Sequence, residues 1–150
     1  MTNHLLPWIY DDGGRKASGF GGKANDCVCR SIVIAAQQDY EKTYEDLKAL
    51  GLKERITKRR SRYGRSHPHS HIWRHTYHKY LDQLGWVFVP TMFIGSGCRV
   101  RLARCNLPEN GRYVVQVSKH LTALVEGQIH DTFDPSREGT RCVYGYWRQI

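Results

Sequence analysis

The chain has 150 residues, of which 40% are hydrophobic, and this is typical of one globular domain with a hydrophobic core. No apolar run approaches the roughly 18 residues of a membrane span, and the N-terminus lacks the basic and apolar regions of a signal peptide. We therefore predict one domain over residues 1–150, without membrane contact and in the cytoplasm. The formal net charge is +9, and residues 53–79 supply most of it, with nine Lys and Arg against one Glu.

The five cysteines are an odd number, and no export signal directs them to an oxidising compartment. We therefore expect reduced thiols. Cys29, Cys98 and Cys142 stand in apolar or glycine-rich surroundings and are predicted to fill space in the core. Cys27 differs from them because it lies where a helix is predicted to begin.

The first half of the chain predicts helices after an irregular start over residues 1–24. Asn25 and Asp26 are both good N-cap residues, and apolar side chains at helical spacing predict a helix over 27–38. A capping box at one end and a glycine at the other predict a second, short helix over 43–51.

A basic, histidine-rich segment over residues 53–69 is expected to form an exposed loop, and Ser70 is expected to cap a third helix that ends at Leu84. Alternating apolar residues beyond it predict strands at 86–89, 100–102, 112–117, 121–125, 128–133 and 142–147. Helices followed by an antiparallel sheet indicate an α+β fold.

The strand pair after residue 119 brings a histidine toward an aspartate. Glu126-Gly127 suits a two-residue hairpin turn, which sets Thr122 opposite Asp131. Side chains two residues apart share a face of a strand, so His120 and Asp131 become diagonal neighbours that long side chains can bridge. We therefore expect Asp131 to orient His120.

A thiol at a helix N-terminus points to nucleophilic chemistry. The helix N-terminus and a nearby imidazolium both lower the pKa of a cysteine, so Cys27 is predicted to become a reactive thiolate beside His120. Its own backbone N–H would stabilise an oxyanion. Each residue alone also has an ordinary explanation as a core thiol, a hydrogen-bonded histidine or a turn aspartate, and the combination favours catalysis.

Three stretches carry a family resemblance: Asn25-Asp26-Cys27, residues 119–125, and Asp131. They resemble the papain-like cysteine peptidase superfamily, in the style of small bacterial bacteriocin-processing peptidases. Residues 111–134 and the turn at 94–98 are also similar to small proteins of tailed bacteriophages, whose setting is the cytoplasm of a bacterial host.

The resemblance covers about residues 20–147 and implies a papain-like fold and a hydrolase of peptide or isopeptide bonds. It implies Cys27 as the nucleophile, His120 as the general base and acid, and Asp131 as the residue that orients the imidazole. Protein or peptide is the expected substrate, and we expect no cofactor.

One departure from the family concerns the oxyanion. Those peptidases usually place a Gln several residues before the Cys, whereas residues 14–26 contain none. Asn25 is the predicted substitute, with Lys23 as another. Transglutaminase-like and deamidase-like acyltransferases resemble this arrangement without that Gln, so acyl transfer or deamidation on the same scaffold is an alternative.

The basic segment supports a different function, that of a non-catalytic phage protein. Its cations would hold phosphates of nucleic acid or an acidic protein surface, or would simply be solvated. The candidate anion-binding residues are Lys58, Arg59, Arg60, Arg62 and Arg65. His71, His75 and His78 lie on one helix face at spacing that suits a metal, yet an exposed histidine face needs none, and we predict no metal site.

Overall fold

The computed structural model describes residues 4–22, 24–58 and 64–150. Within them the helices are α1 (Cys27–Ala36), α2 (Tyr40–Leu52) and α4 (Arg74–Gln83). The strands are β1 (Trp8–Tyr10), β2 (Trp86–Pro90), β3 (Arg112–Val117), β4 (His120–Val125), β5 (Gln128–Asp131) and β6 (Val143–Gln149). They form one six-stranded sheet in the order β1-β5-β4-β3-β6-β2, which confirms the α+β class.

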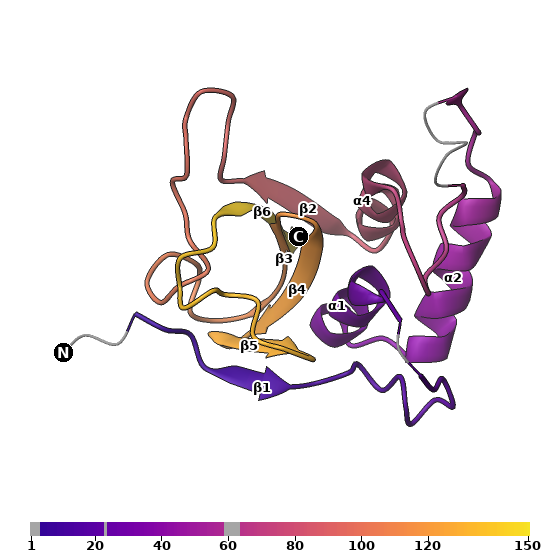
Figure 1. The fold of residues 1–150 in the computed structure, drawn as a ribbon, viewed down its shortest axis with the longest axis horizontal. Coiled ribbons are helices and arrows are strands. Elements are labelled where there is room, and N and C mark those ends of the chain that lie inside the picture. The colour runs from indigo at the N-terminus through magenta and orange to yellow at the C-terminus, as the bar shows by residue number, and fades with distance from the viewer. Residues whose placement is uncertain (1–3, 23, 59–63) are drawn as a thin grey trace.

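The helices gather on one side of a strongly curved sheet (Figure 1). Helix α1 packs on β3 and β4, α2 packs on α1, and α4 contacts α2 and β2. Buried side chains of Ile32, Leu81 and Trp147 belong to the core between the helices and the sheet. A second cluster, with Leu102 and Leu124, covers the other face. Helix α1 is therefore fixed against the middle of the sheet.

The predicted hairpin register is confirmed. Ala123 faces His130 across β4 and β5, as the Glu126-Gly127 turn requires. Both turn residues have positive φ, 49° and 74°, which is the backbone that a tight turn of matching twist needs. The β3–β4 hairpin also turns at two residues, so that Val117 faces His120.

Two helix boundaries differ from the prediction. Helix α2 begins at Tyr40 rather than at residue 43, because the Asp39 side chain caps it by accepting a hydrogen bond from the Lys42 backbone at 3.0 Å. Gly51 lies inside α2, where the Ser66 carbonyl passes so close that a β-carbon would clash. Helix α4 begins at Arg74 and not after Ser70.

The strand predictions also need correction. Strand β1 falls in the segment expected to be irregular, and it pairs with β5 in parallel, so the sheet is not wholly antiparallel. Residues 100–102 form no strand, and Arg101 makes only an isolated bridge with Cys142. The segment predicted as an exposed loop is partly packed, because Ser66 and Pro68 are buried.

A disulfide joins Cys98 to Cys142, with their Cα atoms 5.7 Å apart. The expectation of reduced thiols and of core-filling side chains is therefore wrong for these two residues, because folding brings the loop after β2 to the start of β6. Cys29 is free and fully buried, as predicted. The cytoplasmic location stays a prediction, and it loses the support that reduced thiols would give it.

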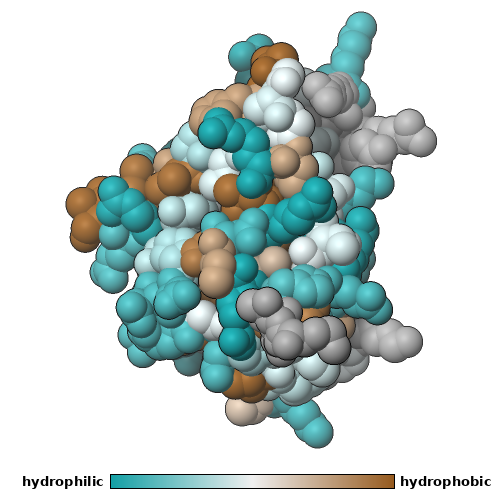
Figure 2. Space-filling model, turned by 90° about the vertical axis from the view of Figure 1, so that its left-hand side faces the viewer, coloured by the Kyte–Doolittle hydropathy of each residue, from teal (hydrophilic) through white to brown (hydrophobic). Residues whose placement is uncertain are grey.

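Among the described residues, no helix has the length and apolar character needed to cross a membrane. The end of the molecule away from the helices is mostly hydrophilic, with hydrophobic residues in small separate groups (Figure 2). Scattered groups of this kind are ordinary on protein surfaces.

Candidate active site

Cys27 is the first residue of α1, and Asp26 occupies the predicted N-cap position before it. The Asp26 side chain makes no cap hydrogen bond. Its oxygens instead accept from Arg30 Nη1 at 2.5 Å and from the Tyr40 hydroxyl at 2.8 Å. The predicted N-cap position is therefore confirmed, but the Asp26 carboxylate binds other partners and leaves the backbone N–H groups of the first turn to other acceptors.

His120 and Asp131 form a short hydrogen bond at the ends of neighbouring strands. His120 Nε2 donates to Asp131 Oδ2 at 2.7 Å, and both side chains are buried. The other carboxylate oxygen accepts from Arg30 Nη2 at 2.9 Å and from the Thr132 backbone N–H at 2.7 Å. Both oxygens of Asp131 are therefore held, which fixes the imidazole plane.

The thiol of Cys27 hydrogen-bonds to His120 and to the backbone N–H of Leu121. Because Asp131 occupies Nε2, the nitrogen left for the sulfur is Nδ1. The pairing of β4 with β5 covers residues Ala123 to Val125 of β4. The Leu121 N–H lies beyond this pairing and is therefore available as a donor to the thiol. The Cys27 sulfur at the start of α1 therefore lies against the end of the β4–β5 pairing.

The surroundings favour the thiolate and the imidazolium together. Burial alone would raise the pKa of Cys27, but the hydrogen bond and charge of His120, the Leu121 N–H and the Arg30 charge together lower this pKa below its usual range. Burial would lower the pKa of His120, but the hydrogen bonds and charges of Asp131 and Cys27 raise it to about 9. Each group therefore stabilises the charged form of the other, and the thiolate–imidazolium pair is favoured over two neutral groups.

The pKa of Asp131 moves the opposite way. Burial would raise it, but the hydrogen bond and charge of His120 and the charge of Arg30 hold it below its usual range. The carboxylate therefore stays ionised at neutral pH and keeps its partner protonated.

A chain of buried polar groups extends from this site into the helical side. Arg30 joins the carboxylates of Asp26 and Asp131, and Tyr40 joins Asp26 to Arg15, whose Nη1 donates to the Tyr40 hydroxyl at 2.8 Å. When Cys27 and His120 are both ionised, two arginines and an imidazolium face two carboxylates and a thiolate, so the buried charges balance. Such balance is what makes buried ionised groups tolerable.

A cavity of about 960 Å³ opens over Cys27 and His120. Trp73, Tyr77 and Phe133 give it aromatic walls. A second cavity of about 700 Å³ adjoins it, and Asn25 lines both. The thiol therefore stands beside a space large enough for several residues of a bound chain.

The other predicted site residues are distributed as follows. Asn25 lies at the cavity, where its backbone N–H donates to the His69 carbonyl at 2.9 Å. Lys58 and Arg65 are exposed and do not line the cavity. Three of the candidate anion-binding residues, Arg59, Arg60 and Arg62, and the alternative oxyanion residue Lys23 lie outside the described residues.

The three histidines predicted on one helix face do not converge, and the prediction is wrong for His71, which precedes α4 and forms an isolated bridge with His67. The His71 ring lies against Trp73, with centroids 4.6 Å apart, whereas His78 lies against Phe88 and Trp147. In the described parts of the chain, no three His, Cys, Asp or Glu side chains form a group that could hold a metal ion.

Sequence reasoning missed Arg30, Tyr40 and Gln116. The spacing of four between Asp26 and Arg30 on a helix is a signal for an ion pair, but nothing local indicates that Arg30 also reaches Asp131, 101 residues away. Gln116 lies on β3 and lines the cavity, so a glutamine does lie at the same cavity as the thiol although none precedes Cys27 in the sequence.

Comparison with protein-family models, with curated proteins and with solved structures found no match to this chain.

Proposed function

We propose that the protein is a papain-like cysteine hydrolase that cleaves a peptide or isopeptide bond. The observation that carries the proposal is the continuous hydrogen-bonded series Cys27, His120 and Asp131, with the thiol at a helix N-terminus beside a cavity. A nucleophile within hydrogen-bond reach of a base, which a third group orients, is the arrangement that nucleophilic catalysis requires.

In the proposed reaction the Cys27 thiolate attacks the carbonyl carbon of a bound amide. The His120 imidazolium then gives its proton to the leaving amine as the C–N bond breaks, and a thioester remains on the sulfur. Water attacks the thioester, His120 accepts the proton of that water, and the carboxylic acid leaves with the thiolate restored. Asp131 holds the ring in one tautomer throughout.

The tetrahedral intermediate places a negative charge on the former carbonyl oxygen. The backbone N–H of Cys27 is the proposed donor to this oxygen, because the Asp26 side chain does not cap the first turn of α1. Asn25 is the proposed side-chain donor, because it lines the cavity next to the thiol. Gln116 lines the same cavity from the sheet side and is a second candidate for this role.

Two other predictions stay open. An acyltransferase or deamidase would use the same three residues, and it would differ by transferring the acyl group or by releasing ammonia. A binding protein that acts through the basic segment would not need the thiol, and the described residues of that segment do not line the cavity.

The proposal is tested by the rate at which iodoacetamide alkylates Cys27 as a function of pH, read by mass spectrometry. An ordinary thiol is only about 1% ionised at pH 6.5, so we expect Cys27 to react at least about tenfold faster than the exposed thiol of Cys105. His120→Ala should remove this advantage, because the imidazolium is then absent.

His130→Ala is the matched control, because this histidine also binds an aspartate but does not line the cavity over the thiol. It should leave the alkylation of Cys27 unchanged. Labelling of Cys27 no faster than that of Cys105, or insensitive to His120→Ala, would refute the hydrolase proposal.

A further inference from the structure

The cavity over Cys27 is unevenly charged. Among the described residues that line it, the only acid is Asp26, which is buried and bound to Arg30 and Tyr40. Arg74 and Lys119 line it as well, and both are exposed. The charge that the cavity offers to a ligand is therefore positive.

The fold places both cations at the cavity that contains the thiol. Arg74 is the first residue of α4, and its guanidinium lies over the Phe88 ring at 5.2 Å and hydrogen-bonds to Tyr77, a wall of the cavity. Lys119 sits in the β3–β4 turn with φ of 57° and directly precedes His120. Neither cation forms an ion pair with a described residue.

We propose that the substrate carries a carboxylate close to the acyl carbon that Cys27 attacks, and that Arg74 and Lys119 bind this carboxylate. The inference rests on the proposed hydrolase function and names the substrate class of that site. An acidic side chain next to the scissile bond and a free terminal carboxylate share this chemistry.

The physical argument is electrostatic. A cleft with charges of one sign and apolar walls concentrates its field and raises the local concentration of an opposite charge. Trp73, Tyr77 and Phe133 supply such walls. Because Asp26 is already bound inside the protein, an incoming carboxylate is the partner that Arg74 and Lys119 lack at this cavity.

The test compares two small reagents that differ in charge. Iodoacetate and iodoacetamide alkylate the same sulfur with loss of iodide, but only iodoacetate carries a carboxylate. The ratio of their rates at Cys27, relative to the ratio for N-acetylcysteine, measures how strongly the cavity attracts a carboxylate. We expect this ratio to exceed one and to fall as salt rises.

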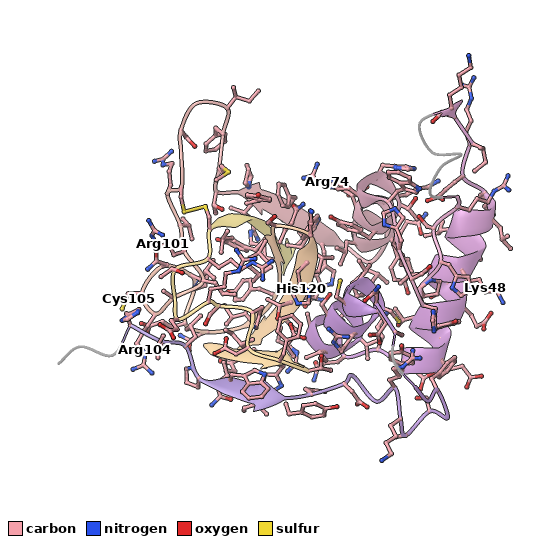
Figure 3. All side chains as sticks on the ribbon, viewed as in Figure 1. Lys48, Arg74, Arg101, Arg104, Cys105 and His120 are labelled. Carbon is pink, nitrogen blue, oxygen red and sulfur yellow. A yellow bond between two sulfur atoms is a disulfide. The ribbon has the colours of Figure 1, made fainter. Side chains whose placement is uncertain are left out.

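Charge removal identifies the cations that produce the preference. Arg74→Gln and Lys119→Gln should each lower the ratio about threefold, and together roughly tenfold. Arg74→Lys keeps the charge and should restore most of the preference. Lys48→Gln is the control, because Lys48 is an exposed cation on α2 that does not line the cavity (Figure 3).

Failure of this inference differs from failure of the hydrolase. If iodoacetamide labels Cys27 quickly while the Gln variants leave the ratio unchanged, the thiol is activated but the carboxylate site is refuted. If iodoacetamide itself labels slowly, the hydrolase proposal fails first. Circular dichroism of each variant shows whether it is folded.

Two further reagents separate the sources of the carboxylate. N-iodoacetyl-glycine presents a terminal carboxylate, and the α-amide of N-iodoacetyl-aspartate presents an acidic side chain, with N-iodoacetyl-glycinamide as the neutral reference. Faster labelling by the first indicates a free terminus, and faster labelling by the second indicates an acidic residue. If neither exceeds the neutral reagent, the proposal is wrong.

Discussion

Two histidine–aspartate pairs use neighbouring residues of β5 and have different surroundings. His120 binds Asp131 at 2.7 Å, and His130 binds Asp11 at 3.0 Å. The side chains of the first pair are 9% and 1% exposed, whereas those of the second are 20% and 32% exposed. The hydrogen bond itself is similar in both, so the differences come from what surrounds it.

The buried pair has two further partners. Arg30 binds the far oxygen of Asp131, and Cys27 binds the other side of His120. These contacts turn a histidine–aspartate pair into part of a charged cluster whose imidazole has a pKa of about 9. Burial and the contacts with Arg30 and Cys27 therefore favour a thiolate more than the histidine–aspartate hydrogen bond does by itself.

The largest effect is expected when the arginine is removed. Arg30→Met leaves Asp26 and Asp131 buried without their shared cation, which should cost about 3–5 kcal/mol in the free energy of unfolding. Urea denaturation measures this loss. The substitution makes the buried pair resemble the His130–Asp11 pair, which forms no ion pair with an arginine of the described residues.

The matched control removes the cation of an exposed ion pair with the same spacing. Lys42 binds Asp46 at 2.6 Å across four residues of α2, and the Lys42 side chain is 62% exposed. Lys42→Met should cost at most about 0.5 kcal/mol because solvent screens such pairs. A similar small cost for Arg30→Met would show that the buried cluster does not hold the fold together.

Removing the carboxylate should weaken the thiolate through the histidine. Without Asp131, burial of His120 is no longer opposed by a hydrogen bond and a negative charge, so Asp131→Asn should lower the pKa of His120 from about 9. The pH of half-maximal Cys27 alkylation should then rise by about one unit. Histidine titration by NMR and the alkylation profile measure the two shifts.

Asp11→Asn provides the comparison from the other pair. It removes the same group from a less deeply buried histidine, and it should leave both the His120 titration and the Cys27 profile unchanged. An equal response to Asp11→Asn would mean that overall charge, and not the local hydrogen bond, sets the reactivity of the thiol.

The contrast between these pairs also shows how far the sequence predicts the site. The meeting of His120 with Asp131 follows from a two-residue turn, because local backbone geometry fixes strand register. The start of α1 at Cys27 follows from local signals too. The packing of α1 on β4, which brings the thiol to the histidine, depends on contacts between distant segments. It is predicted only from the family resemblance.

Other features that depend on long-range contacts were not predicted or were predicted wrongly. The Cys98–Cys142 disulfide spans 44 residues, and the parallel pairing of β1 with β5 spans more than 100. No role for Arg30 is predicted from the sequence, because a buried arginine is uncommon and its partner Asp131 lies 101 residues further along the chain.

The smallest effect is expected at the far end of the charged cluster, with Tyr40→Phe. The change removes one hydroxyl and leaves a buried oxygen of Asp26 and a nitrogen of Arg15 without that partner. Because these two groups already approach within 3.9 Å, they can partly pair with each other, and we expect a loss of about 1–2 kcal/mol in unfolding free energy. Tyr113→Phe, which removes an exposed hydroxyl bound to the Asn110 carbonyl, should cost less.

The alkylation rate of Cys27 in Tyr40→Phe decides where the site ends. Arg30 stands between Tyr40 and the histidine pair, and its two bonds to Asp131 and Asp26 are independent of the hydroxyl. We therefore expect the Cys27 alkylation rate of Tyr40→Phe to stay within about twofold of the wild-type rate at each pH, because Tyr40 acts on stability alone. A tenfold slower reaction would instead mean that the cluster works as one unit, and that groups as distant as Tyr40 contribute to the difference between the buried pair and the half-buried His130–Asp11 pair.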